Sequence, residues 1–485
     1  MKRQVPKFWF LLIFTLIALL PTGDATADEV RLPNNSGRLD VGAPPARAAW
    51  RRLDVAPEVR LFVLPGTAAD RDAERIAAEV RQSLRRVQGR LGIEATPVLE
   101  VYLVERVFWQ GGAAYENGRI LITYSDRNYT TIPLRAYLDH EITHALSQTF
   151  VPEGGETNAL LSEGLATWTT GGHYGPDPIH EIATALARSR AYVPLARLVT
   201  DFRAAQHETA YIEAASFVGW LIERWGMETF KRLYGNAAVP HIVLGRTYAD
   251  LEREWLRWLS GRPVSPFTVR WFGLRIRAFE TMRQYQETFD PFARQLPDSP
   301  VKWNADLTNQ YRDNPDAPVN VALETLLKAL QEDIRCGRLI AADRRLEELQ
   351  ASILANDIVG PEAKIREAVA ASLAQTASTL EGGRLADTLP TNPLLLFWQE
   401  RVGRPVYQEV ADIVATPGAE HVMAVVWWFD VEGGEALPLR VVFERNGSGW
   451  YVKSVRQGTG GKDQCTGWPT GFTINPAFAW LTSAS

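Results

Sequence analysis

The spacing of apolar residues in the first third of the chain predicts a sheet packed against helices. Alternating apolar and polar positions indicate strands at Val59 to Leu64 and Val98 to Val104, and a strand or hairpin at Ala113 to Tyr124. Apolar residues recur with a helical period from about Ala68 to Leu91. Asn117-Gly118 is a typical hairpin turn sequence, so the third strand region is expected to fold back on itself.

Two antiparallel helices are predicted directly after this region. The first has its apolar residues on one stripe, namely Leu134, Leu138, Ile142, Ala145 and Leu146. Thr130 or Thr131 can cap this helix. The break at residues 151–156 ends it, and Thr157 opens a second helix that closes at Gly171. So short a connection implies that the two helices run antiparallel.

The remainder of the chain changes from helix-like to strand-like. Ala215 to Trp225 and Tyr248 to Leu259 have the pattern of amphipathic helices, and residues 264 to about 380 are mostly helix-like. The C-terminal residues then alternate as antiparallel strands, at His421 to Asp430, Leu437 to Arg445 and Trp450 to Arg456. The order of elements therefore predicts an α+β chain.

The first of the two antiparallel helices carries His140-Glu141-Ile142-Thr143-His144, with both histidines off the apolar stripe. Residues four apart on a helix differ by about 40° and roughly 6 Å of rise, so both imidazoles can reach one divalent ion. Glu141 would reach a water in the ion's open position, as metal-assisted hydrolysis requires. The spacing indicates a site for one zinc ion, and the alternative is a pair of capped or core histidines.

A third metal ligand is expected from the returning helix. Glu163 lies about two turns into that helix and can face back toward His140 and His144. Glu153 and Glu156 are rival carboxylates, but they lie in the connecting loop, where nothing aims them. We therefore expect Glu163 to complete the ligand set.

These motifs resemble those of the gluzincins. The pairing of His140-Glu141-Ile142-Thr143-His144 with Leu161-Ser162-Glu163-Gly164-Leu165-Ala166 is similar to the peptidase MA-like group and to the aminopeptidase N-type enzymes. Metzincins would need Gly at Ser147 and His at Phe150, and the thermolysin pattern would need Asp at Thr167. The resemblance covers roughly residues 57 to 262 and implies a zincin-type fold with zinc-dependent peptidase activity.

The resemblance also implies a role for Tyr211. Tyr211-Ile212-Glu213-Ala214-Ala215-Ser216 is similar to a Tyr-x-Lys-Gly-Ala-Ser stretch of the aminopeptidase N-type enzymes, whose Tyr hydroxyl stabilises the tetrahedral intermediate. A phenol at the start of a rigid helix can donate to a developing oxyanion. A Tyr that only packs at a helix start is the alternative, and His207, one turn earlier, is a second candidate donor.

With this resemblance the chain divides into five parts. They are a signal peptide at 1–27, a linker at 28–56, a gluzincin catalytic domain at 57–262, a helical accessory segment at 263–385 and a β-rich C-terminal domain at 386–485. The expected fold class is thus α+β, with a zincin-type sheet and helices, a helical segment and a β-rich end. No motif in the last two parts carries chemistry.

The N-terminus predicts export from the cytoplasm. Basic residues precede an apolar run from Phe8 to Leu20, and Ala25-Thr26-Ala27 provides a small-residue cleavage site. The run is shorter than the roughly 20 residues of an ordinary membrane span. We expect a secreted or periplasmic protein, which would contact a membrane only if the segment stays uncleaved as an anchor.

Composition adds two expectations. The formal net charge of −5 gives no reason to propose nucleic-acid binding. The only two cysteines, Cys336 and Cys465, lie in the C-terminal half, and in an oxidising compartment they can form one disulfide. The oligomeric state stays open.

The sequence as a whole predicts an exported zinc metallopeptidase that hydrolyses peptide or protein substrates. His140, His144 and Glu163 would hold the zinc, Glu141 would act on the water, and Tyr211 would stabilise the oxyanion. The alternative is a non-catalytic zincin-fold module that binds a partner through its C-terminal region. The choice between exopeptidase and endopeptidase stays open.

Overall fold

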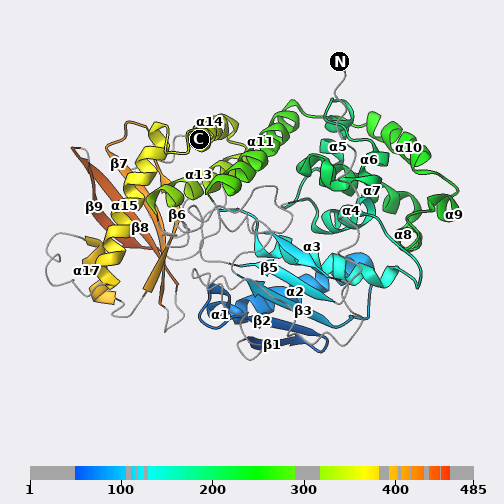
Figure 1. Ribbon diagram of the computed structural model, residues 1–485, viewed down its shortest axis with the longest axis horizontal. Coiled ribbons are helices and arrows are strands. Elements are labelled where there is room, and N and C mark those ends of the chain that lie inside the picture. The colour runs from blue at the N-terminus through cyan, green and yellow to red at the C-terminus, as the bar shows by residue number, and fades with distance from the viewer. Residues whose placement is uncertain are drawn as a thin grey trace, which may run out of the picture.

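The computed structural model describes residues 50–458, apart from 105–110, 116–117, 125–128, 174, 290–316, 382–392, 402–405, 416, 431–435 and 448. The predicted signal peptide, its cleavage site and Cys465 lie outside the described residues, as does Asn117 of the predicted turn. The described chain is mixed α and β, as the sequence predicts. Figure 1 shows an N-terminal sheet at the bottom, helices α4 to α10 above and to its right, and a C-terminal sheet on the left.

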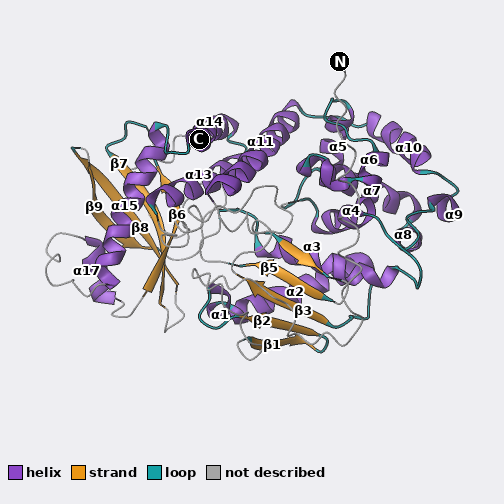
Figure 2. Ribbon diagram, in the orientation of Figure 1, coloured by secondary structure: helices purple, strands orange, loops and turns teal. Residues whose placement is uncertain are grey.

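The N-terminal sheet has five strands in the order β1-β2-β3-β5-β4 (Figure 2). The strands are β1 (Arg51–Ala56), β2 (Val59–Val63), β3 (Leu99–Val104), β4 (Gly112–Ala114) and β5 (Arg119–Thr123). β2, β3 and β5 are parallel neighbours, whereas β1 and β4 are antiparallel to theirs. The predicted hairpin is present as β4 and β5, and β4 is one of the two edge strands of this sheet, opposite β1.

Two differences from the predicted pattern occur before the third strand. β1 falls inside residues 28–56, which the sequence analysis assigns to a linker, so the sheet begins earlier than predicted. The predicted helix from Ala68 to Leu91 is divided at Asp72 into α1 (Ala68–Arg71) and α2 (Ala73–Leu91). Gly92 ends α2 in the left-handed conformation that favours glycine.

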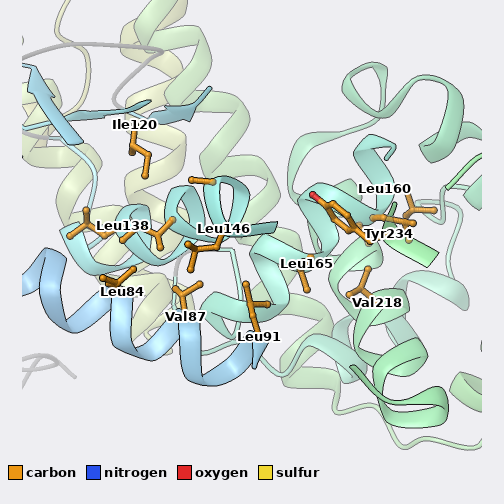
Figure 3. Packing of buried hydrophobic residues seen from close by; sticks show 14 of the residues in the cluster. Leu84, Val87, Leu91, Ile120, Leu138, Leu146, Leu160, Leu165, Val218 and Tyr234 are labelled. Atoms are coloured by element: carbon orange, nitrogen blue, oxygen red, sulfur yellow. The ribbon is translucent and has the colours of Figure 1, made fainter. Parts of the chain in front are cut away.

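Helices α2 and α3 (Leu134–Ser147) form a layer on the sheet because each buries one apolar stripe. Leu84, Val87 and Leu91 of α2 lie against Leu138 and Leu146 of α3 (Figure 3). Of the apolar stripe predicted for α3, Leu138, Ile142, Ala145 and Leu146 are buried and Leu134 is partly buried. Pro133 occupies the N-cap position without a side-chain cap, so neither Thr130 nor Thr131 caps this helix.

The remaining helices of the N-terminal region pack beside this layer. They are α4 (Ala159–Thr170), α5 (Ile179–Ala187), α6 (Leu195–Thr200), α7 (His207–Trp225), α8 (Met227–Tyr234), α9 (Pro240–Leu244) and α10 (Tyr248–Ser260), with short 3-10 turns at Gln148–Phe150 and Phe202–Ala204. Asn158 rather than Thr157 caps α4, since its side chain accepts from the Leu161 amide. Gly171 ends α4 as predicted, and Gly226 ends α7.

The C-terminal half contains long helices and a second sheet. The helices are α11 (Pro266–Phe289), α13 (Pro318–Arg335), α14 (Leu339–Ala355), α15 (Pro361–Glu381) and α17 (Pro393–Arg401). The sheet is antiparallel in the order β6 (Val406–Val414), β7 (His421–Asp430), β8 (Ala436–Asn446) and β9 (Gly449–Gln457). The three predicted strands are confirmed, and β6 joins them. α11 packs on α5 and α7 as well as on α13 and α14, so it links the two halves.

Two further observations bear on the sequence predictions. Cys336 at the end of α13 is disulfide-bonded. No helix within the described ranges is both long enough and apolar enough to cross a membrane.

Glu213 is a fully buried carboxyl on α7, at the position where the resembling family has Lys. Both of its oxygens accept from the Val193 amide, at 3.3 and 3.2 Å. Burial raises the pKa of Glu213 well above its usual 4.5, with Glu252 adding to the rise and the Val193 amide opposing it. The folded protein therefore holds this proton at pH values where the unfolded chain has released it.

We predict that Glu213→Gln removes a pH-dependent loss of stability. A carboxyl with a raised folded pKa contributes stability that is fully present below the unfolded pKa and is lost as the pH rises toward the folded pKa. As the pH is raised from 5 to 8, the melting temperature of Glu213→Gln, followed by circular dichroism, should therefore rise relative to the melting temperature of wild type. The exposed Glu94→Gln serves as control, and parallel curves for wild type and Glu213→Gln would contradict the prediction.

Candidate metal site

His140, His144 and Glu163 converge at the contact of α3 and α4. The Nε2 atoms of the two histidines are 3.1 Å apart. The Oε2 atom of Glu163 lies 3.2 Å from His140 Nε2 and 3.3 Å from His144 Nε2. The three side chains are mostly buried, with 15%, 15% and 22% of their surfaces exposed. The structure thus brings together the three residues that the sequence analysis nominates as metal ligands.

Hydrogen bonds behind His144 fix the direction of its ring. His144 Nδ1 lies 3.1 Å from Ser162 Oγ, so its Nε2 faces Glu163 and His140. The Tyr234 hydroxyl donates to Ser162 Oγ at 3.2 Å and lies 2.9 Å from Ser147 Oγ. Such bonds to the second ring nitrogen are common behind metal-binding histidines, because they select the tautomer and orient the ring.

Glu163 is ionised at this position. Burial alone would raise the pKa of its carboxyl, but the charge of His144 and the hydrogen bonds of both histidines hold that pKa well below the usual value. A metal ligand carboxylate must be deprotonated, so Glu163 is in the form that a cation requires.

Glu141 lies beside this group and against β4, an edge strand of the N-terminal sheet. It is buried, and the nearby Ala114 backbone of β4 favours its charged form. Burial raises the pKa of Glu141 to about 7, with the charge of His144 lowering it and that of Glu163 raising it. A Cβ atom at Gly112 would lie 2.8 Å from Glu141 Cγ, so this carboxylate packs directly against glycine backbone.

The rival carboxylates do not reach the histidines. Glu153 and Glu156 are exposed in the loop between α3 and α4, and the backbone of Glu156 forms an isolated β-bridge with Asn236. Of the residues that the structure describes, only Glu163 joins His140 and His144 in a group able to hold a metal ion. The loop carboxylates are therefore poor candidates for the third ligand.

Tyr211 also reaches the site. Its phenol lies near the Glu163 carboxylate, and its ring centre lies 6.1 Å from that of His140. Burial, together with the charges of Glu163 and Glu141, raises the pKa of the phenol well above 10, so the hydroxyl keeps its proton. The His207 ring contacts the Tyr211 ring and stacks on Phe279 of α11, with the centres of the stacked rings 4.5 Å apart.

A second group of potential metal ligands lies next to Tyr211, and no sequence motif marks most of its residues. It consists of His173, His207 and Glu208. His173 Nδ1 is 3.0 Å from Glu208 Oε1, and the other oxygen of Glu208 accepts from Arg275 Nε at 2.7 Å. His173 and Arg275 belong to no spacing motif, so only the adjacent pair His207-Glu208 could have drawn attention to this place.

Helices α4 and α7 approach closely because glycine stands at their contacts. A Cβ at Gly164 would lie 2.6 Å from the Ala214 carbonyl oxygen, and one at Gly219 would lie 2.8 Å from Trp168 Cδ1. Gly164 follows Glu163 directly, and Ala214 is one turn from Tyr211. The spacing of the two helices therefore sets the distance between Glu163 and Tyr211.

No protein-family model matches this chain, and a search of curated proteins finds no match either. The likeness to gluzincins therefore rests on the motifs themselves, and the geometry above carries the functional argument.

We predict that Gly164→Ala weakens both the fold and the metal site. The added methyl overlaps the backbone of α7, and such overpacking typically costs about 1–3 kcal/mol in unfolding free energy. Because α4 must shift, zinc affinity should fall as well, as measured by competition with a chromophoric chelator. Gly89→Ala on α2 is the matched control, since its Cβ meets nothing within 4 Å and should stabilise a helix by roughly 0.5–1 kcal/mol. Equal zinc affinity in Gly164→Ala and wild type would contradict the prediction.

Proposed function

We propose that this protein is a zinc-dependent peptidase with a zincin-type N-terminal domain. The observation that carries the proposal is the triangle formed by His140 Nε2, His144 Nε2 and Glu163 Oε2, with sides of 3.1 to 3.3 Å. Three corners of a tetrahedron around zinc, with bonds of about 2.0–2.1 Å, would lie about 3.3 Å apart. Glu141, whose carboxylate zinc ligation does not require, lies beside this triangle.

The charges of the two candidate groups favour the first as the zinc site. Among the described ion pairs, none joins Glu141 or Glu163 to Lys or Arg. Glu208 of the second group is paired with Arg275. A buried carboxylate that already has a guanidinium partner is a weaker ligand for a dication, which that guanidinium would also repel.

The donor set fits catalytic rather than structural zinc. Catalytic sites use three protein ligands and leave one position open, as two histidines and a glutamate would here. When bound, zinc supplies a Lewis acid that polarises the scissile carbonyl and makes water acidic enough to attack near neutral pH. A carboxylate oxygen of Glu141 accepts the proton of that water and returns it to the leaving amine nitrogen.

The edge strand β4 offers a binding surface for an extended peptide. The Gly111 carbonyl accepts from Thr123, and the Tyr115 amide donates to Arg119, so these residues pair with β5. In an antiparallel pair, residues that hydrogen-bond to the partner strand alternate with residues whose backbone N–H and C=O groups point away from it. The backbone of Gly112 and Ala114 therefore faces Glu141 and the open edge. A substrate strand added there would bring its peptide bond to the site through main-chain hydrogen bonds.

Tyr211 supplies the donor for the developing oxyanion. Its phenol is protonated and is directed at Glu163, within the same site. A preoriented hydroxyl in a buried place stabilises negative charge on the former carbonyl oxygen. His207 contacts Tyr211 and Phe279 rather than the zinc ligands, which makes it the weaker candidate for this role.

The alternative from another class is a zincin-fold module that binds zinc and a partner but does not hydrolyse peptides. It would need His140, His144 and Glu163, but it would have no use for a carboxylate at Glu141 packed against the backbone of β4. The peptidase accounts for these features. Export through the N-terminal signal peptide would place its substrates outside the cytoplasm.

We predict one zinc ion per chain, held by His140, His144 and Glu163. His140→Ala or Glu163→Ala each removes a ligand, so both variants should retain far less zinc than wild type in elemental analysis after dialysis. Glu153→Ala is the matched control, because it removes an exposed loop carboxylate. Full zinc content in both ligand variants would disprove this site.

Glu141→Gln tests the peptidase against the binding module. The amide keeps the shape of the side chain but cannot accept a proton from water, so the variant should retain its zinc and its melting temperature while losing nearly all hydrolysis. Turnover is measured on a broad peptide library, with and without a chelator. Absence of turnover by zinc-loaded wild type across that library would favour the module, and equal turnover by the variant would remove Glu141 from the mechanism.

Tyr211→Phe tests the oxyanion donor. Loss of one such donor typically costs roughly 3–4 kcal/mol of transition-state stabilisation, which is on the order of a hundred- to a thousand-fold in rate. The effect should appear in kcat with KM changed much less, since the bond is stronger in the transition state than in the ground state. If Tyr211→Phe stayed within a few-fold of wild type while His207→Ala lost its activity, the role would pass to His207.

A further inference from the structure

Next to Tyr211, four residues form a closed ring of hydrogen bonds, namely His173, Glu208, Arg275 and Asp177. His173 Nδ1 pairs with Glu208 Oε1 at 3.0 Å, and Glu208 Oε2 accepts from Arg275 Nε at 2.7 Å. Arg275 Nη1 donates to Asp177 Oδ1 at 2.7 Å, and Asp177 Oδ2 accepts from the His173 backbone amide at 3.0 Å. The ring therefore holds His173 by its side chain and by its backbone.

Burial makes this ring rigid. Glu208 is completely buried, and the side chains of Arg275, His173 and Asp177 are at most 10% exposed. Burial alone would raise the pKa of Glu208, but Arg275 and His173 hold it far below the usual value, so the carboxylate stays charged. Breaking a buried, hydrogen-bonded ion pair leaves an uncompensated charge and is costly, so displacing any one of these residues from the ring is unfavourable.

Tyr211 packs against the imidazole of His173, which these hydrogen bonds hold in place. The rings of His173 and Tyr211 are stacked, with centres 4.2 Å apart and planes 17° apart. Phe202 meets the Tyr211 ring edge-on, with centres 5.2 Å apart. The phenol can therefore turn its hydroxyl away from Glu163 only by leaving this stack.

We propose that Arg275 of α11 is a positioning residue for Tyr211, acting through Glu208 and His173. The helical segment that follows the predicted catalytic domain thereby completes the reaction site. This inference rests on the proposed function, because it assigns Tyr211 a role in the transition state. Arg275 itself touches neither the zinc ligands nor Glu141 in any described ion pair or hydrogen bond.

The kinetic test is a double-mutant cycle in the zinc-loaded full chain. Arg275→Met should lower kcat about 10- to 100-fold with KM within about threefold, because a small misplacement of an orienting group is costly. In a Tyr211→Phe background the same change should cost less than about twofold, since the two residues act on one interaction. Losses that multiply in the double variant would overturn the proposal.

Two controls separate positioning from loss of the fold. Arg277→Met removes an arginine from the same helix, where it is about half exposed and pairs with Asp343, and it should leave kcat unchanged. Glu208→Gln keeps the shape of the ring but removes its central charge, so it should reproduce the kcat loss even if Arg275→Met folds poorly. Full activity in a folded Glu208→Gln variant would overturn the proposal.

A spectroscopic readout keeps the inference distinct from the proposed function. In protein labelled at its tyrosine rings, the Tyr211 signal is identified by its loss in Tyr211→Phe. Its chemical shift, displaced by the stacked imidazole, should move in Arg275→Met and in Glu208→Gln but not in Arg277→Met. An unmoved signal would overturn the positioning role even if the enzyme were active, whereas a moved signal with no turnover by wild type would refute only the proposed function. A second zinc per chain that is lost in Glu208→Gln would show that the ring is a metal site instead.

Discussion

The close contact of α4 and α7 is the constraint on which the site depends. Glu163 and Tyr211 come from these two helices, and Gly164 lets the helix backbones touch, which brings the Tyr211 phenol near the Glu163 carboxylate. An alanine at this position would meet the Ala214 carbonyl, which cannot move without displacing the turn that carries Tyr211. The glycine that follows Glu163 in the motif is thus explained by packing, without reference to any relative.

Two groups of buried charges surround this contact, and they are compensated differently. The ring of Asp177, Arg275, Glu208 and His173 contains its own cation, so its charges are paired within the protein. Glu141 and Glu163 lie beside His140 and His144, and among the described ion pairs neither carboxylate is joined to Lys or Arg. An external cation would offset the negative charge of this second group, whereas the first group already contains its own cation. This difference distinguishes the proposed metal site from the proposed support for Tyr211.

Sequence reasoning succeeded where a single helix fixes the geometry and failed where distant segments meet. His140 and His144 share a face because of helical periodicity, and Glu163 faces back because the connection to the next helix is short. The Thr130 or Thr131 cap was wrong because a proline stands at the N-cap position. β1 was assigned to a linker, since Arg51-Arg52-Leu53-Asp54 shows no regular alternation and only pairing with β2 defines it. The ring around Arg275 joins three separate segments, so no local pattern could reveal it.

The contacts of α11 change where the functional unit ends. The motifs end near residue 262, and that boundary follows the resemblance to the gluzincins. Arg275 and Phe279 lie beyond it, yet one pairs with the buried Glu208 and the other stacks on His207. A chain cut at residue 262 would retain every proposed zinc ligand and Glu141, but it would leave Glu208 buried without its guanidinium or exposed to water. In either case His173 would lose its fixed partner and Tyr211 its support. The unit able to orient all of the proposed site residues therefore extends through α11, although the metal ligands themselves do not require it.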